Sequence, residues 1–174
     1  MNKFKLSRVL ALTFSLATIH LILMEKSALA QNVAKGKPAT QSSTERDLVA
    51  TKCFDGNYYG FGETAGLCST QPETNPQITV DLGEVYHVLM IAVINREDCC
   101  QDRLVGSELR VGNSTDPLDN SSCGVVVDDG GFYDCDLWGR YVTLRRATSV
   151  QDYFNVAEIG VWAQRNICPR GVAS

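Results

Sequence analysis

The chain has 174 residues, of which 44% are hydrophobic, enough for a domain with a sizeable core. It carries 16 basic and 20 acidic side chains, a formal net charge of −4 at pH 7. This balance argues against a non-specific nucleic-acid binder, which needs a basic face.

The first thirty residues are predicted to be a secretory signal peptide. A basic start precedes an uncharged, mostly apolar run at 9–24, and Ala28 and Ala30 place small residues two apart, as signal peptidase requires. The apolar run is shorter than the roughly 20 residues needed to cross a bilayer. Residues 31–174 are therefore expected to form one exported domain without membrane insertion.

Removing this segment changes the charge and the metal chemistry. Residues 1–30 hold four basic residues and one acidic residue, so 12 basic and 19 acidic residues remain, a net charge of −7. His87 is then the only histidine, which excludes a histidine-rich zinc site and any mechanism with two histidines. All seven cysteines remain, and export allows disulfides to form. Sequons at Asn113 and Asn120 are candidate glycosylation sites.

The remaining pattern predicts an all-β fold with almost no helix. Six segments alternate or run apolar, are rich in Val, Ile, Tyr and Thr, and are separated by Gly, Asp, Asn and Pro clusters. The predicted strands are 77–82, 85–95, 107–111, 125–127, 139–146 and 156–163. This spacing favours one antiparallel β-sandwich of the jelly-roll type, with its core at about 32–163 and a short C-terminal tail. Trp138 and Trp162 lie beside or within strands and are expected in the core.

The most unusual segment contains two adjacent cysteines, Cys99 and Cys100. Their Cα atoms are about 3.8 Å apart, below the usual disulfide range of about 4.4–6.8 Å. Either they form a strained eight-membered ring, or each pairs with another cysteine. A ring would present a rigid, flat patch of sulfur and carbon.

Charged side chains flank these cysteines. Arg96 and Arg103 each offer a planar fork of donors, and Asp98 can hold one fork in place. Fixed donors beside an apolar patch suit a sugar with vicinal hydroxyls. The alternative is an ordinary surface cluster of salt bridges.

This segment resembles the signature of F-type lectins, the fucose-binding family that includes eel agglutinin. The family pattern is His, twenty-six residues, Arg, one residue, Asp, four residues, then Arg or Lys. Arg96, Asp98 and Arg103 fit its second half. Similarity extends along the domain at 32–34, 36–42, 54–57, 80–83, 139–142 and 157–159. The resemblance implies a jelly-roll β-sandwich.

By this resemblance, Arg96 and Arg103 bond the ring oxygen and hydroxyls of fucose, and a Cys99–Cys100 disulfide stacks on the sugar. The histidine of the motif is absent: Ser69 stands twenty-seven positions before Arg96, and Thr70 follows it. A hydroxyl there can still donate or accept one hydrogen bond with a sugar, but it has a shorter reach than an imidazole. Weaker fucose affinity or a preference for another sugar is expected.

Aromatic residues of the loop at 57–66 are further candidates for sugar contact. Tyr58, Tyr59 and Phe61 can stack on the apolar face of a sugar. The equally open alternative is that they pack the loop onto the domain. The stretch at 41–49 is a candidate rim of the same site.

A second group of residues suggests a calcium site. Asp55 and Asn57 stand two apart, Glu158 lies in the last predicted strand, and calcium takes six to eight oxygen ligands. The Asp-Gly-Asn segment alone is equally an ordinary turn. The resemblance implies a structural calcium ion held by Lys52, Asp55, Asn57, Leu67, Ala157 and Glu158. Lys52, Leu67 and Ala157 would contribute backbone or loop oxygens.

The resemblance also implies the cysteine pairing. Cys123 and Cys135 match a bridge of the family. The family ties the Cys68 position to the start of the last strand, where Ala157 stands here, so Cys53 is expected to pair with Cys68 instead. Cys168 is left over and is predicted to link protomers covalently.

These features predict a secreted protein, and the resemblance implies a calcium-stabilised lectin that binds fucosylated or related glycans in innate recognition or cell agglutination. The alternative is a discoidin-type adhesion module that binds protein or lipid. A hydrolase finds little support, because no nucleophile–base pair is evident. The neighbouring carboxylates Glu97 and Asp98 seldom face one bond from opposite sides.

Overall fold

The computed structural model describes residues 30–59 and 66–165. The predicted signal peptide, apart from Ala30, lies outside these ranges, as do Phe61 and Cys168. Antiparallel strands and three short 3-10 helices form the described part, which confirms the predicted all-β class. None of its helices is long and apolar enough to cross a membrane.

Nine strands are formed by the described residues, and every paired strand runs antiparallel to its neighbour. They are β1 (Gln31–Asn32), β2 (Ala39–Gln41), β3 (Cys68–Ser69), β4 (Gln77–Ile94), β5 (Glu108–Gly112), β6 (Ser121–Val125), β7 (Gly131–Arg145), β8 (Asn155–Val156) and β9 (Glu158–Arg165). The 3-10 helices are η1 (Ala50–Phe54), η2 (Gln101–Leu104) and η3 (Pro117–Asp119). The larger sheet has the order β1-β9-β4-β7-β5-β6, with β2 on β4, while β3 pairs with β8.

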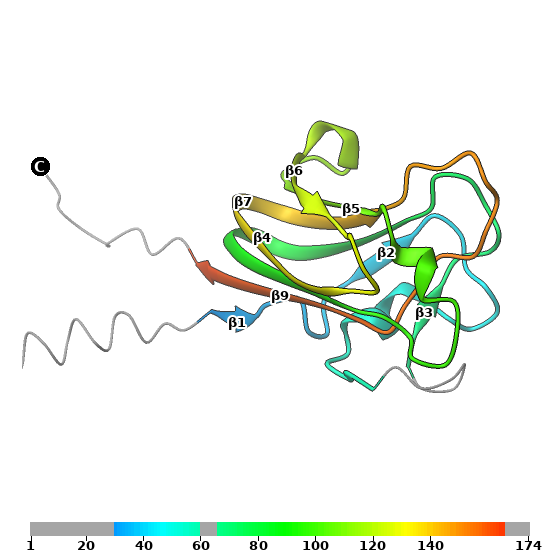
Figure 1. Cartoon of the computed structure of the whole chain (residues 1–174). Coiled ribbons are helices and arrows are strands. Elements are labelled where there is room, and N and C mark those ends of the chain that lie inside the picture. The colour runs from blue at the N-terminus through cyan, green and yellow to red at the C-terminus, as the bar shows by residue number, and fades with distance from the viewer. Residues whose placement is uncertain (1–29, 60–65, 166–174) are drawn as a thin grey trace, which may run out of the picture. The chain divides into compact units, whose positions relative to one another are not determined.

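The long strands β4 and β7 contribute to both layers of a sandwich. The first part of β4 pairs with the last part of β7, beside β2, β5 and β6, and the remainder of β4 pairs with the first part of β7 and with β9. The register shifts between Asp81 and Tyr86, where Gly83 has a φ of +86°. Glycine takes this conformation without steric cost, so the strand can bend there. Figure 1 shows the resulting two layers.

The core lies between these layers. Ile78, Val80 and Leu82 on one part of β4, and Val88 and Ile91 on the other, are fully buried in the same cluster. Each such side chain stabilises the fold by about 1.5–3 kcal/mol through burial. The alternation of apolar residues in the sequence therefore reports the core correctly.

Several predicted strand bounds are wrong. Segments 77–82 and 85–95 belong to one bent strand, β4. The segment 139–146 is only the end of β7, because the earlier part of β7 alternates partly buried residues with exposed ones that include Asp134 and Asp136. The strand predicted at 125–127 lies at Ser121–Val125, whose small and polar residues do not show the apolar pattern of a strand. The segment 156–163 divides into β8 and β9 at Ala157, whose N–H donates to the carbonyl of Ile94 outside the sheet ladder (2.9 Å).

The prediction that both tryptophans belong to the core is also wrong. Trp138 is 47% exposed and Trp162 is only partly buried. Both project from the outer face of their layer, because neighbouring strand positions alternate between core and solvent. Apolar character alone does not reveal which side a strand residue faces.

The two sequons differ in accessibility. Asn113 is exposed, whereas Asn120 is 5% exposed. The amide of Asn120 donates to the carbonyl of Ser114 (2.9 Å) and accepts from the N–H of the same residue (3.0 Å). The amide nitrogen of Asn120 is thus enclosed, and this arrangement contradicts its prediction as a glycan carrier.

Two of the predicted disulfides join neighbouring elements of the chain. Cys53–Cys68 joins η1 to β3, and Cys123–Cys135 joins β6 to β7. Loops at 42–49, 95–106 and 147–154 gather at the end of the sandwich on the right of Figure 1, in cyan, green and orange. Because several loops converge there, this end is the natural place for a binding site.

Candidate functional site

The segment that follows β4 forms a closed loop at this end of the sandwich. Asn95 is buried, and its side chain donates to the carbonyl of Gln101 (2.9 Å) while accepting from the N–H of Arg96 (2.8 Å). Leu104, fully buried in η2, anchors the other end of the loop. We call residues 95–104 the arginine loop.

Arg96 is held in place by a bidentate ion pair. Its Nε and Nη2 each donate to one oxygen of Asp98, both at 2.7 Å. These hydrogen bonds hold the pKa of Asp98 below its ordinary value, against the opposing effect of burial. The Arg96 side chain is 10% exposed, so the guanidinium is largely withdrawn from solvent and fixed in direction.

Cys99 and Cys100 form a disulfide with each other, as predicted. Their Cα atoms are 3.8 Å apart, and Cys100 has a φ of 62°. A left-handed backbone at a residue with a side chain is uncommon and is found preferentially at functional sites. Both cysteines are partly exposed, so the disulfide ring reaches the surface. In the sequence it lies between Arg96 and Arg103.

Arg103 is fixed from a different part of the chain. Its Nε lies 3.2 Å from Asp152 Oδ1, and its guanidinium lies over the ring of Tyr153 at 5.2 Å. The carbonyl of Arg103 accepts from Arg146 Nη1 (3.0 Å). The Arg103 side chain is 20% exposed, so it too presents a restricted edge to solvent.

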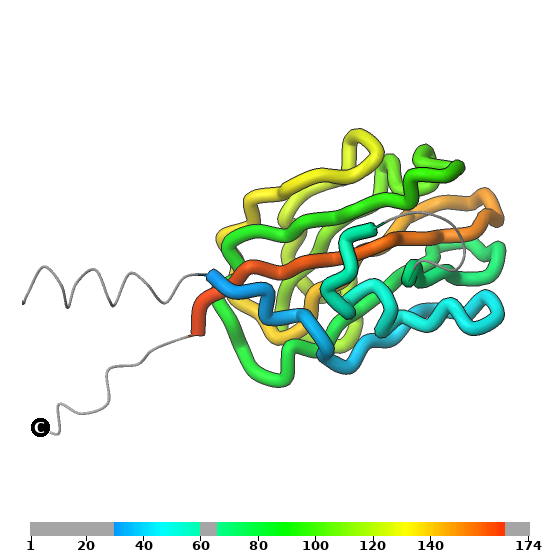
Figure 2. Tube along the Cα trace, turned by 90° about the horizontal axis from the view of Figure 1, so that it is seen from below, coloured from blue at the N-terminus to red at the C-terminus, as the bar shows by residue number. Residues whose placement is uncertain are grey.

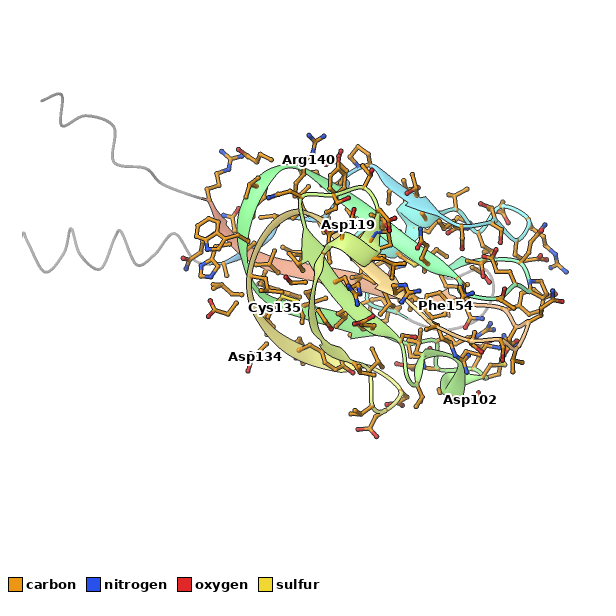
Figure 3. The ribbon with its side chains drawn as sticks, turned by 90° about the horizontal axis from the view of Figure 1, so that it is seen from above. Asp102, Asp119, Asp134, Cys135, Arg140 and Phe154 are labelled. Carbon is orange, nitrogen blue, oxygen red and sulfur yellow. A yellow bond between two sulfur atoms is a disulfide. The ribbon has the colours of Figure 1, made fainter. Side chains whose placement is uncertain are left out.

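The sequence did not indicate Asp152 and Tyr153, because they lie outside the predicted strands and motifs. They reach the arginine loop through pairing of distant segments. The Glu73 N–H donates to the Asp152 carbonyl (3.2 Å), and the Thr70 N–H donates to the Phe154 carbonyl (3.0 Å). Figure 3 shows Phe154 within the domain and Asp102 of the arginine loop near its edge.

Ser69 and Thr70 do not offer their hydroxyls to a ligand. They are 2% and 0% exposed. Ser69 donates to the Thr70 carbonyl (3.1 Å), and Thr70 donates to the Gln71 carbonyl (3.0 Å) while accepting from the Phe154 N–H (3.1 Å). The expectation that either hydroxyl replaces the absent histidine is contradicted. Gln71, the next residue, is exposed.

A polar cleft of about 440 Å³ adjoins Arg96. Glu97, Gln101, Asp129 and Gly130 are among the residues that line it. A Cβ at Gly130 would lie 2.5 Å from the Val93 carbonyl, so only glycine lets this turn pack closely against the end of β4. The cleft places carboxylates beside the arginine loop.

Tyr58 and Tyr59 lie elsewhere. The Tyr58 hydroxyl accepts from Asn32 Nδ2 (3.2 Å), which places Tyr58 beside β1. Figure 2 shows the segment before residue 60 passing over β9. Tyr58 is 42% and Tyr59 75% exposed. The hydrogen bond from Asn32 places Tyr58 at the β1 edge of the sheet, and its role as a sugar contact stays a prediction.

The predicted calcium ligands Asp55, Asn57 and Glu158 come together. Glu158 Oε1 accepts from the Gly56 N–H (3.0 Å), and the Asn57 N–H donates to Asp55 Oδ1 (2.7 Å). A Cβ at Gly66 would lie 3.2 Å from Asn57 Nδ2 and 3.6 Å from Asp55 Oδ2. Glycine therefore keeps a small space open beside both side chains.

Glu158 carries the main chemical evidence that a cation fits here. It is fully buried, and its Oε2 has no hydrogen-bond partner. Burial, with a smaller contribution from the nearby Asp55 carboxylate, raises the pKa of Glu158 to about 8. A cation would satisfy this oxygen and stabilise both carboxylates. Lys52 points away, with its Nζ 3.3 Å from Asp47 Oδ2, so only its backbone oxygen is a candidate ligand.

Comparisons with known proteins agree with this geometry. A family model described as NedA-like, galactose-binding domain matches residues 52–144. Fucolectin-4 of Anguilla japonica is 32% identical over 127 residues, covering 66% of this chain and 70% of the relative. The chain belongs to the fucolectin family of F-type lectins. The expected family and jelly-roll fold are thereby confirmed.

Two longer proteins also contain a region similar to this lectin. A pentraxin fusion protein of Xenopus laevis is 31% identical over 142 residues, which cover 77% of this chain and 34% of that protein. The crystal structure of a serum F-lectin from striped bass, Morone saxatilis, has a TM-score of 0.71 and 27% identity. The match covers 78% of this chain and 48% of the striped-bass chain. The chain therefore spans about half the length of the striped-bass lectin and about a third of the pentraxin fusion protein.

Proposed function

We propose that this lectin binds fucose, or a closely related sugar, on glycans through the arginine loop. The observation that carries the proposal is that Arg96 and Arg103 are each fixed by a separate carboxylate on either side of a vicinal disulfide. Fixed charged donors can bond a sugar's ring oxygen and hydroxyls, while the disulfide packs against its C–H face. The fucolectin relative supports fucose as the first ligand to test. Binding, without catalysis, is the expected activity.

Calorimetric titration with fucose tests this proposal. A hydrogen bond from a charged group contributes about 1.5–3 kcal/mol, so Arg96→Ala and Arg103→Ala are each expected to weaken binding by about 10- to 150-fold. Arg165→Ala is the matched control, because Arg165 lies at the end of β9 and pairs with Glu84. Wild-type protein that binds neither fucose nor fucosylated glycans would overturn the proposal.

The absent histidine sets the expected strength of binding. Since Ser69 and Thr70 are enclosed, the exposed Gln71 is the nearest described residue in sequence able to take its place. We expect Gln71→His to raise fucose affinity, whereas Thr70→His is expected to disrupt the buried contact with Phe154. Equal thermal stability of the wild type and Thr70→His would contradict this assignment.

We further propose that calcium stabilises the domain by binding Asp55, Asn57 and Glu158 with backbone oxygens of Lys52, Leu67 and Ala157. The buried, unpartnered Glu158 Oε2 supports this. Calcium at a hundred times its dissociation constant adds about 2.7 kcal/mol to the unfolding free energy. Chelation is therefore expected to lower the melting temperature by several degrees. Glu158→Gln, which mimics the uncharged carboxyl, is expected to remove this dependence on calcium.

The setting of the activity is also a proposal. A lectin whose arginine loop binds one sugar weakly holds cells more firmly when several copies are joined. We propose that Cys168 links protomers and that the assembly acts in agglutination or innate recognition. The three disulfides of the described part support an oxidising compartment. A monomer on a non-reducing gel would count against the covalent link.

A further inference from the structure

The outer face of one layer of the sandwich carries a group of aromatic side chains outside the arginine loop. Phe132 and Trp138 project from β7, His87 from β4 and Trp162 from β9. The ladder places Trp138 directly opposite His87. We call these four side chains the aromatic face.

Trp138 and His87 form a flat shelf. Their ring centroids are 4.6 Å apart, with an angle of 7° between the ring planes. His87 Nε2 lies 2.6 Å from Asp136 Oδ1, and this contact fixes the direction of the imidazole. Trp138 is 47% exposed although His87 covers one side of it. Its exposed area therefore comes chiefly from the opposite face and the edge of the indole.

Phe132 and Trp162 provide a second apolar surface on the same layer. Phe132 is 68% exposed, and its ring centroid is 6.4 Å from that of Trp162. A Cβ at Gly160 would lie 2.5 Å from the indole of Trp162, so the ring lies against the backbone at that glycine. The absence of a side chain at Gly160 thus makes room for the indole to lie close to the sheet.

Carboxylates decide what this face can bind. Asp134 and Asp136 lie on β7 between Phe132 and Trp138, and both are exposed. Asp134 points away from the domain in Figure 3. A protein partner would bury these charges at the centre of its interface, where charged residues are depleted. An anionic membrane or an acidic sugar would be repelled.

An uncharged sugar satisfies both features of the face. One side of a hexopyranose ring carries C–H groups that pack on an aromatic ring, and its hydroxyls donate hydrogen bonds to carboxylates. Phe132 and Trp138 are six residues apart on one strand, at most about 20 Å. The face therefore suits several linked sugars better than one.

We propose that the aromatic face is a second carbohydrate site, which binds chains of uncharged hexopyranoses. It does not depend on the sugar that the arginine loop binds. Two sites in one domain would let a single copy bind two glycans of the same surface, because binding at the second site becomes intramolecular once the first is occupied.

The sequence supplies a reporter for this site. Its two tryptophans, Trp138 and Trp162, both lie on the aromatic face. Titration with cellohexaose and with N-acetylchitohexaose is expected to change the intrinsic tryptophan fluorescence of the full chain. Fucose at the arginine loop is expected to leave it unchanged. No fluorescence change with either oligosaccharide would overturn the proposal.

Variants then assign the binding to the face. Calorimetry with the oligosaccharide that binds is expected to show about tenfold or greater weakening in Trp138→Ala and in Phe132→Ala. Arg96→Ala, in the arginine loop, is expected to bind it like the wild type. Leu118→Ala is the matched control, because Leu118 is 60% exposed on η3. Unchanged affinity in Trp138→Ala of native thermal stability would also overturn the proposal.

Discussion

The arginine loop and the aromatic face are held in place by different means. In the loop, Arg96 and Arg103 are fixed by ion pairs with Asp98 and Asp152, the latter from a distant segment. On the face, rings project from paired strands, so the ladder register sets their spacing. The loop therefore depends on a few charged contacts, whereas the face depends on the integrity of the sheet.

Removing one disulfide at a time should have the largest effect, on stability at the sheet and on fucose binding at the arginine loop. Cys123–Cys135 spans 12 residues of sequence, and closing a loop of about this length stabilises a protein by about 3 kcal/mol. Replacing both cysteines by serine is expected to lower the unfolding free energy by about that amount, measured in denaturant, with fucose affinity retained. Replacing Cys99 and Cys100 is expected to spare stability and to weaken fucose binding about tenfold. Equal losses of stability in the two variants would contradict the comparison.

Loosening the arginines should have a smaller effect than removing them. Asp98→Asn and Asp152→Asn each weaken an ion pair while keeping the shape of the side chain. A cost of about 0.5–1.5 kcal/mol predicts a two- to tenfold loss of fucose affinity by calorimetry. Asp136→Asn, on the aromatic face, is the control and is expected to bind fucose normally. The comparison fails if Asp136→Asn weakens fucose binding as much as Asp98→Asn does.

The pH dependence of fucose binding follows from Asp98. Arg96 lowers the pKa of Asp98 from its ordinary value of 3.8, so the pair is fully charged at neutral and mildly acidic pH. Its contribution is present above the ordinary pKa and is lost as the pH falls through the lowered one. Fucose affinity is expected to stay constant down to about pH 5 and to fall only below about pH 4. A decline that begins near pH 6 would point to another group.

The two sequons are expected to differ in glycosylation. Asn113 is exposed and Asn120 is enclosed by its contacts with Ser114. Asn113→Gln is expected to remove any N-glycan mass from protein expressed in a eukaryotic host. Asn120→Gln is expected to leave that mass and to lower the melting temperature, because two buried hydrogen bonds are lost. A mass decrease in Asn120→Gln would show that the observed enclosure of this amide does not exist during glycosylation.

The sequence predicted features that depend on local spacing. The alternation at Ile78, Val80 and Leu82 identified a core strand, and the spacing of Arg96, Asp98 and Arg103 identified the loop. Asp152 was missed because its approach to Arg103 depends on tertiary pairing between 70–73 and 152–154. Trp138 was placed in the core because apolar character does not distinguish the two faces of a strand.

The bent strand β4 has a consequence for how the domain loses its structure. Because β4 and β7 run through both layers, neither layer can detach without breaking the ladder that the other uses. Heating should therefore produce one cooperative transition, with calorimetric and van't Hoff enthalpies that agree. An intermediate in which one layer is folded and the other unfolded is not expected, because the strand pairing of β4 with β7 continues through both layers.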